Sequence, residues 1–197
     1  MTESSDISPD ANVAPSASVG GFCVIKAGAS VATRARLESH VVVSPGVEIG
    51  PGARVASFVE LPRGVVLGAN VVLGAGVVFA EPGIQRVTAA RGHEPAVQTR
   101  IEDDAVVGAG AIVMRGLFLG RGCVVGAGAM VTRDVADFSI VSGRPARHIG
   151  WACICGARLH EDAKHISCTS CGSEYVFFED ELFPVRLVLP EAPADEE

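Results

Sequence analysis

Four cysteines in the last quarter of the chain have the type and spacing of a metal site. They form two close pairs with twelve residues between the pairs: Cys153, Cys155, Cys168 and Cys171. Each pair is followed by glycine, and two such pairs suit four thiolates around tetrahedral Zn²⁺, although the first has Cys-x-Cys rather than Cys-x-x-Cys spacing. His160 and His165 are weaker alternatives as ligands. Because four cysteines leave no open coordination position, we predict a structural zinc ion and not a catalytic one.

A second candidate for chemistry is the segment 80–94, which contains Glu81 and His93. Imidazole titrates near neutral pH, so histidine is the commonest general base, and a carboxylate can hold an ammonium group or accept its proton. We therefore predict His93 and Glu81 as the catalytic residues. The alternative is a solvated loop in which His93 contacts a phosphate or nothing.

The elements that position these residues come from a six-residue repeat. An apolar residue occurs at every sixth position over residues 7–79, and the pattern resumes over residues 101–131. The fifth position of each hexad is mostly small, and Cys23 and Cys123 fall there as core residues. Side chains alternate in a strand, so the first and fifth positions can face one interior, and three hexads make one triangular coil. The repeat therefore predicts stacked parallel coils and disfavours an antiparallel sandwich, whose turn signals would recur every 8–12 residues or so.

The repeat is interrupted once. Residues 7–78 supply four coils and residues 101–136 supply two more, and we interpret residues 80–94 as a loop inserted between the two blocks. Glycine often occupies the second position of a hexad, as at Gly108 and Gly126, and we attribute this to a tight corner.

Two stretches resemble the repeats of the hexapeptide-repeat acyltransferases. Residues 107–112 read Val-Gly-Ala-Gly-Ala-Ile, and residues 125–130 read Val-Gly-Ala-Gly-Ala-Met. The resemblance implies an all-β fold, a left-handed parallel β-helix, and a homotrimer. Residues 142–151, Ser-Gly-Arg-Pro-Ala-Arg-His-Ile-Gly-Trp, resemble more closely the bacterial sugar-nucleotide N-acetyltransferases that act on UDP-linked amino or diamino sugars. Those enzymes have Phe-Thr-Asn and Pro-Arg at the loop, where this chain has Phe79-Ala80-Glu81 and Gln85-Arg86.

The resemblance implies N-acetylation of an amino group on a nucleotide-linked amino sugar by direct attack on acetyl-CoA. It places the acetyl-CoA co-substrate on small residues of the coils and on two arginines: Gly108, Ala109, Gly126, Ala127, Arg133 and Arg147. The nearest alternative is an O-acetyltransferase with His93 as the base. A γ-type carbonic anhydrase would need three histidines around zinc, and a non-catalytic β-helix would leave the inserted loop without a purpose.

Composition restricts the other classes of protein. The net charge is -7, from 16 Lys+Arg and 23 Asp+Glu, which argues against a nucleic-acid partner. No apolar run reaches the ~18 residues of a membrane span. The first residues lack the features of a signal peptide, so we expect a cytoplasmic protein, in which zinc is favoured over disulfides.

The expected organisation has five parts. They are a flexible N-terminus at 1–6, the β-helix at 7–137 with its loop at 80–94, a connector at 138–150, a zinc-ribbon-like segment at 151–178 and a C-terminal tail at 179–197.

Overall fold

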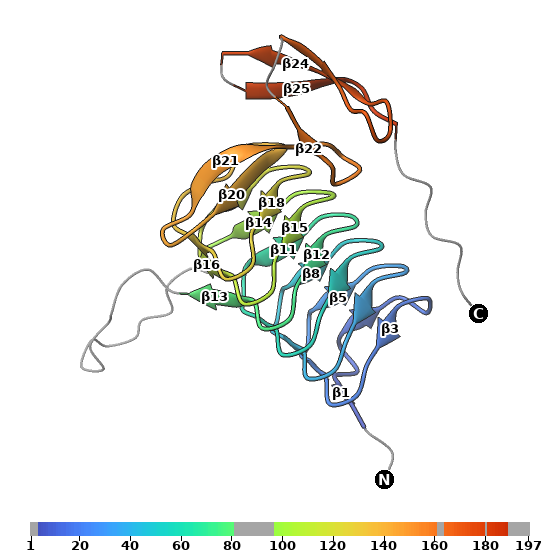
Figure 1. Cartoon of the computed structure of the whole chain (residues 1–197). Helices are drawn as coiled ribbons and strands as arrows, with labels where there is room; N and C mark the ends of the chain where they lie inside the picture. The colour runs from blue at the N-terminus through green and yellow to red at the C-terminus, as the bar shows by residue number, and fades with distance from the viewer. Residues whose placement is uncertain (1–3, 81–96, 161–163, 180, 189–197) are drawn as a thin grey trace.

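The computed structural model describes residues 4–80, 97–160, 164–179 and 181–188. These residues form short β-strands joined by turns, and the chain winds into a stack of coils with a small sheet at its C-terminal end (Figure 1). Within these ranges, no helix has the length and hydrophobicity needed to cross a membrane.

Strands of successive coils pair in parallel and form three faces. The first face contains β1 (Asp6–Ile7), β4 (Val24–Ile25), β7 (Val42–Val43) and β10 (Glu60–Leu61), followed by β13 (Val78–Ala80), β16 (Ile112–Met114) and β19 (Met130–Val131). The second contains β2 (Asn12–Val13), β5 (Ser30–Val31), β8 (Glu48–Ile49), β11 (Val65–Leu67), β14 (Thr99–Ile101) and β17 (Phe118–Leu119). The third contains β3 (Ser18–Val19), β6 (Arg36–Leu37), β9 (Arg54–Val55), β12 (Val72–Leu73), β15 (Val106–Val107), β18 (Val124–Val125) and β20 (Ser139–Ser142).

The register repeats with each coil, so like positions stack on like. Ile7 pairs with Ile25, and Ile25 pairs with Val43. The buried core of the coils is made of aliphatic side chains and small residues, with Cys23 and Cys123 at 0% exposure. The prediction of an all-β parallel β-helix built from hexapeptide repeats is therefore confirmed.

The inserted segment interrupts a coil and does not separate two complete blocks. On the side before the insertion, β13 pairs with β16, and on the side after it, β14 pairs with both β11 and β17. One coil is thus formed from chain on both sides of the insertion, and the stack continues through it. Residues 81–96, and with them most of the expected loop at 80–94, lie outside the described residues.

The glycines at the second hexad position have a different cause from the one expected. Gly108 does not have a positive φ, so the backbone does not require glycine for a turn there. A Cβ on Gly108 would instead lie 2.5 Å from the nitrogen and 2.8 Å from the Cα of Ala127 in the next coil. The positive φ values occur two residues later, as at Gly110, where φ is 65°. Glycine at the second position therefore allows adjacent coils to approach each other.

This close approach predicts that Gly108→Asn destabilises the protein much more than Gly46→Asn. Gly46 has a φ of 74°, which asparagine tolerates, and a Cβ there would meet no atom within 4 Å. The clash at Gly108 should cost about 3 kcal/mol, the upper end for overpacking, and Gly46→Asn less than about 1 kcal/mol. Thermal unfolding measures both, and equal losses would reject close approach as the role of Gly108.

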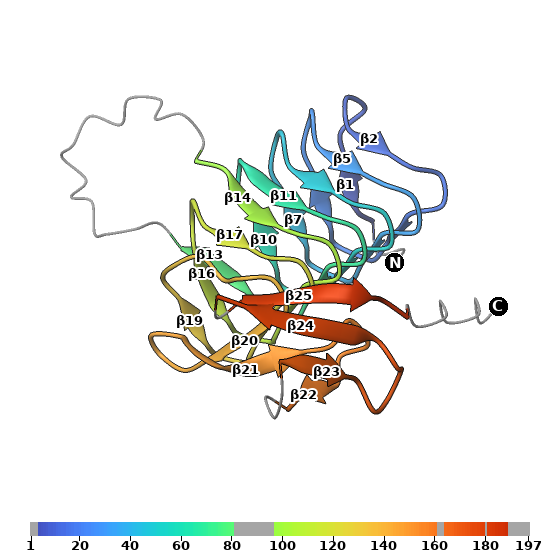
Figure 2. The ribbon, with the colours of Figure 1, turned by 90° about the horizontal axis from the view of Figure 1, so that it is seen from above.

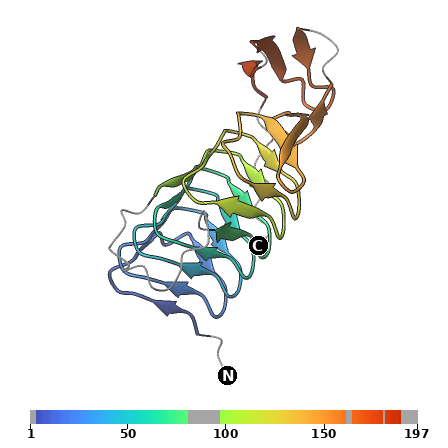
Figure 3. The ribbon, with the colours of Figure 1, turned by 90° about the vertical axis from the view of Figure 1, so that its left-hand side faces the viewer.

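The end of the coil stack is covered by antiparallel structure. Strand β20 pairs with β21 (Arg147–Ala152), which pairs with β22 (Arg158–Leu159). A separate sheet of β23 (His165–Ser167), β24 (Glu174–Phe178) and β25 (Glu181–Arg186) follows; Figure 3 shows it beyond the last coil, and Figure 2 looks down on it from above. β25 falls within the segment expected as a C-terminal tail. We call residues 151–188 the cap.

The cap has a small core of its own, and unlike the coils it is built on rings. Phe138 at the end of the coils meets Tyr175 of β24 with ring centroids 5.4 Å apart, and Trp151 meets Phe177 at 5.7 Å. Cys153 and Cys168 are buried in the same cluster. The predicted metal site is therefore part of the cap core.

Candidate functional site

The four small residues predicted to contact acetyl-CoA lie at one corner of the β-helix, between the third and first faces. Gly108 and Ala109 occupy the turn from β15 to β16, and Gly126 and Ala127 occupy the equivalent turn in the next coil. The two turns stack, with the nitrogen of Gly128 donating a hydrogen bond to the oxygen of Ala109 at 2.8 Å. The sequence-predicted residues are thus brought together.

Ring side chains cover the same corner in the first coils, and glycine takes their place in the later ones. In the first coils it carries a column of stacked rings, Phe22, His40 and Phe58, with centroids 4.9 Å apart. The column continues as Gly76 and Gly110, where a Cβ would meet no atom within 4 Å. We call the open part, Gly76, Gly110, Gly128 and the small residues beside them, the glycine corner.

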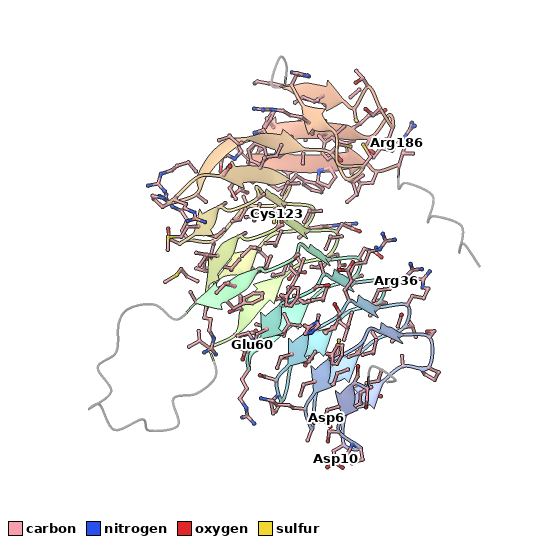
Figure 4. The ribbon with its side chains drawn as sticks, turned by 60° about the horizontal axis from the view of Figure 1, so that its bottom comes forward. Asp6, Asp10, Arg36, Glu60, Cys123 and Arg186 are labelled. Atoms are coloured by element: carbon pink, nitrogen blue, oxygen red, sulfur yellow. The ribbon has the colours of Figure 1, made fainter. Side chains whose placement is uncertain are left out.

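Apolar side chains flank the glycine corner on both faces. The outward positions of the third face are Val72, Val106, Val124 and Ile140, and those of the first face are Val78, Ile112 and Met130. In the earlier coils the matching positions include charged residues, such as Arg36 and Glu60, which Figure 4 labels. An extended, largely apolar chain could therefore lie along this corner against exposed backbone.

Both predicted arginines line a cavity of about 730 Å³ at the C-terminal end of the coils. Arg133 follows β19, and Arg147 begins β21, so the end of the last coil places both residues at the same cavity. We call this space the cap cavity, because Phe177, Glu179 and Glu181 of the cap line its other side. Arg144 lies instead at the glycine corner, where its Nε donates to the oxygen of Gly128 at 2.6 Å.

His148 is a candidate that sequence reasoning missed. It lines the cap cavity, its Nδ1 lies 2.6 Å from Oγ of the buried Ser139, and its ring contacts that of Trp151 in a tilted arrangement with centroids 4.6 Å apart. The signal available was its place in the distinctive stretch 142–151, next to Arg147. Periodicity could not find it, because Ser139 and His148 meet only where β21 folds back on β20.

Glu81 and His93, the predicted catalytic residues, lie outside the described residues. Their roles remain predictions. The described chain fixes only where their segment leaves and re-enters the β-helix, after β13 on the first face and before β14 on the second.

The four cysteines of the cap come together as the sequence predicts. All four Sγ atoms lie within 4.8 Å of one another. The Sγ atoms of Cys153 and Cys171 are 3.4 Å apart, and those of Cys155 and Cys168 are 3.7 Å apart. Four thiolates about 2.3 Å from one zinc ion in tetrahedral geometry would be ~3.8 Å apart, whereas a disulfide bond is ~2.05 Å long. The arrangement fits a zinc site and not two disulfides.

The surroundings of the thiols differ. Burial raises the pKa of the Cys155 thiol to about 12. The hydrogen bond between Cys171 and the hydroxyl of Ser173, 3.1 Å long, is the main cause that lowers the pKa of Cys171 to about 6. Burial also raises the pKa of Tyr175, which stays a neutral phenol and donates to Sγ of Cys153 at 3.2 Å. The site therefore has hydrogen-bond donors that stabilise negative sulfur.

The chain matches the family model described as the hexapeptide repeat of succinyl-transferase over residues 52–79 and 98–133. It is 46% identical over 61 residues to a chloramphenicol acetyltransferase of Agrobacterium fabrum, covering 31% of this chain and 29% of that protein. It is 29% identical over 80 residues to a dTDP-3-amino-3,6-dideoxy-alpha-D-galactopyranose 3-N-acetyltransferase of Aneurinibacillus thermoaerophilus, covering 41% of each. The matched parts thus span less than half the length of these curated relatives.

Among solved structures, PerB from Caulobacter crescentus in complex with CoA and GDP-perosamine is 24% identical, with a TM-score of 0.36 over 73% of this chain and 56% of that chain. The acetyltransferase domain of PglB from Neisseria gonorrhoeae, in complex with acetyl coenzyme A, is 26% identical, also with a TM-score of 0.36 over 73% and 56%. The chain thus folds as a β-helix of six-residue repeats, and its matched stretches are similar in sequence to a hexapeptide-repeat family and to acetyltransferases.

Proposed function

We propose that the protein is an acetyl-CoA-dependent N-acetyltransferase acting on a nucleotide-linked amino sugar. The observation that carries the proposal is the glycine corner: exposed backbone flanked by apolar rows, with Arg144 at its C-terminal end. A pantetheine arm is extended, mostly apolar and able to hydrogen-bond to backbone. Arg133 and Arg147 lie beyond the same end of the coils and supply cations for the phosphates of CoA.

The reaction would be a direct transfer. The acceptor amine attacks the thioester carbonyl, a C–N bond forms, the C–S bond breaks, and CoA leaves as a thiolate that receives, through the base, the proton given up by the amine. The amine loses a proton during this reaction, and His93 or Glu81 would accept that proton. A carboxylate at position 81 can hold an ammonium group of the acceptor or take its proton, and the asparagine of similar enzymes cannot serve as that base.

The acceptor class rests on the named amino-sugar N-acetyltransferase and on the stretch 142–151. Other matched relatives are named for different acceptors, including chloramphenicol and 2,3,4,5-tetrahydropyridine-2,6-dicarboxylate. O-acetylation with His93 as the base is the second candidate, because an imidazole serves a hydroxyl acceptor equally well. A carbonic-anhydrase-like site has no support in the described chain, where the one cluster able to hold a metal consists of cysteines.

The proposal includes a homotrimer and a reducing compartment such as the cytoplasm. The apolar rows beside the glycine corner are a surface that a second copy could cover. Four of the six cysteines form a cluster that suits a metal ion, and metal sites are favoured over disulfides where the compartment is reducing.

We further propose that the four cysteines of the cap hold a structural Zn²⁺. The distances between their sulfur atoms suit tetrahedral coordination, and four thiolates leave no position for a substrate. The ion would supply folding free energy to the cap, whose own core is small.

The test is release of CoA thiol from acetyl-CoA with a panel of acceptors. UDP- and dTDP-linked amino sugars are expected to give turnover, while the matching sugars with a hydroxyl in place of the amine are not. Turnover of the hydroxyl sugars alone would favour O-acetylation. No acetyl-CoA-dependent product with either set would reject the proposed function.

A further inference from the structure

The cap cavity is a separate space from the glycine corner, and two parts of the molecule build it. On one side lie the last inward-facing residues of the coils, including Val135 and Val141. On the other side the cap supplies Phe177 from β24 and Glu181 from β25. Its volume of about 730 Å³ falls within the ~300–1,000 Å³ of typical small-molecule sites. A β-helix that ended at its last coil would lack this cavity.

One wall of the cap cavity is aromatic. The ring of Trp151 contacts that of His148 with centroids 4.6 Å apart in a tilted arrangement, and it contacts that of Phe177 edge to face with centroids 5.7 Å apart. All three residues line the cavity. Such a wall suits a flat ring system, because stacking of a base on aromatic side chains is favourable whichever base is bound.

A second group of side chains can donate hydrogen bonds to an anion. Arg133 and Arg147 line the cavity, and within the described ranges neither forms an ion pair with a carboxylate. Arg147 donates to the backbone oxygen of Ala146 at 2.9 Å, which leaves further guanidinium donors for a ligand. The contact between Ser139 and Nδ1 fixes the imidazole of His148, whose Nε2 is left for a ligand. Guanidinium and imidazole groups in one cavity suit a phosphate.

Three carboxylates complete the lining, and their placement suits hydroxyl groups. Asp134 already accepts a hydrogen bond from the nitrogen of Phe118 at 2.8 Å. Glu179 and Glu181 are exposed, come from the cap and line the same cavity as the two arginines. Carboxylates recognise ribose hydroxyls in nucleotide sites, because each oxygen can accept from a hydroxyl.

We propose that the cap cavity binds a nucleoside phosphate. The aromatic wall would take the base, the carboxylates of the cap would take the ribose, and Arg133, Arg147 and His148 would take the phosphate. The identity of the natural ligand rests on the proposed function. Under that function, the nucleoside phosphate that binds here would be part of one of the two substrates. One candidate is the adenosine phosphate end of acetyl-CoA, and the other is the nucleotide part of the acceptor.

Trp151 provides the readout, because it is the one tryptophan of the chain and lies in the wall. The full-length protein is titrated with adenosine 3′,5′-bisphosphate, with dTDP, with UDP and with inorganic phosphate alone, and tryptophan emission is recorded. A saturable change with the bisphosphate identifies the acyl donor as the source. A saturable change with dTDP or UDP identifies the acceptor. A response to none of the three nucleotides, or to inorganic phosphate only, overturns the proposal.

Variants locate the binding. Arg147→Ala and His148→Gln should each raise the Kd of the bound nucleotide at least about tenfold, as expected for loss of a charge-assisted hydrogen bond. Phe177→Leu keeps an apolar side chain but removes the ring. It should weaken the binding of nucleotides while leaving the far-UV spectrum unchanged.

The controls are Arg186→Ala and Phe183→Leu, both on β25 and outside the cavity lining. Figure 4 labels Arg186 on the cap. If the control variants weaken nucleotide binding as much as the cavity variants do, the proposal is overturned. Acetyl-CoA turnover is measured on the same samples: nucleotide binding without turnover rejects the proposed function alone, and turnover without nucleotide binding rejects this inference alone.

Discussion

Cys168→Ser is expected to abolish zinc binding and to unfold the cap while the β-helix stays folded. Structural zinc with four thiolates contributes on the order of 10 kcal/mol of apparent free energy at neutral pH, and a lost ligand removes most of it. Elemental analysis should find about one zinc per chain in the wild type and almost none in the variant. Trp151, 6% exposed in the cap core, should then show a red-shifted emission.

The coil stack has a separate core, so its far-UV spectrum should persist in this variant. Cys23→Ser is the matched control, because Cys23 lies in the coils and its Sγ donates to the oxygen of Glu38 at 2.8 Å, a bond that serine can replace. A chelator added to the wild type should reproduce the effect of Cys168→Ser. Metal-free wild-type protein with a buried tryptophan would contradict the zinc site.

The second large effect is expected in the inserted segment. If His93 or Glu81 accepts the proton of the acceptor amine, removing the base should lower kcat by about 10²–10⁴-fold with little change in the KM for acetyl-CoA. His93→Ala and Glu81→Gln are compared with the wild type in the thiol-release assay. The variant that removes the base should show the large loss, and imidazole in solution should partly restore His93→Ala if His93 is that base.

Glu60→Gln is the control for charge removal, because Glu60 is exposed on the outer side of β10, as Figure 4 shows. Rates close to wild type in both His93→Ala and Glu81→Gln would show that neither residue is the base. A loss confined to KM for the acceptor would instead indicate that the segment binds the sugar without accepting its proton.

Much of the fold was predictable because the contacts of a β-helix repeat in the sequence. Ile25 stacks on Ile7 and under Val43, and each pair is separated by one coil of eighteen residues. A six-residue period therefore identifies the strands, the core and the three faces together. The four cysteines were predictable for a related reason, since zinc ligands of two close pairs carry their spacing in the chain.

The cap cavity was not predictable in this way. Ser139 meets His148 because β21 reverses direction on β20, and Trp151 meets Phe177 across the cap core. These contacts occur once and have no period. The same limit explains the glycine at position 108, whose role depends on Ala127 in the next coil and is not visible in local sequence.

The sequence by itself thus determined the repeat, the aliphatic core and the composition of the cysteine cluster, because each is encoded by spacing along the chain. Only the tertiary structure decided that the insertion interrupts a coil and that the column of rings ends at Phe58, with the glycine corner in the coils that follow. It also decided that Arg133 and Arg147 share a cavity with His148. Those features depend on which side chains the stacking of coils and the reversal at β21 bring together. Such packing joins residues at irregular separations, and no periodic signal marks them.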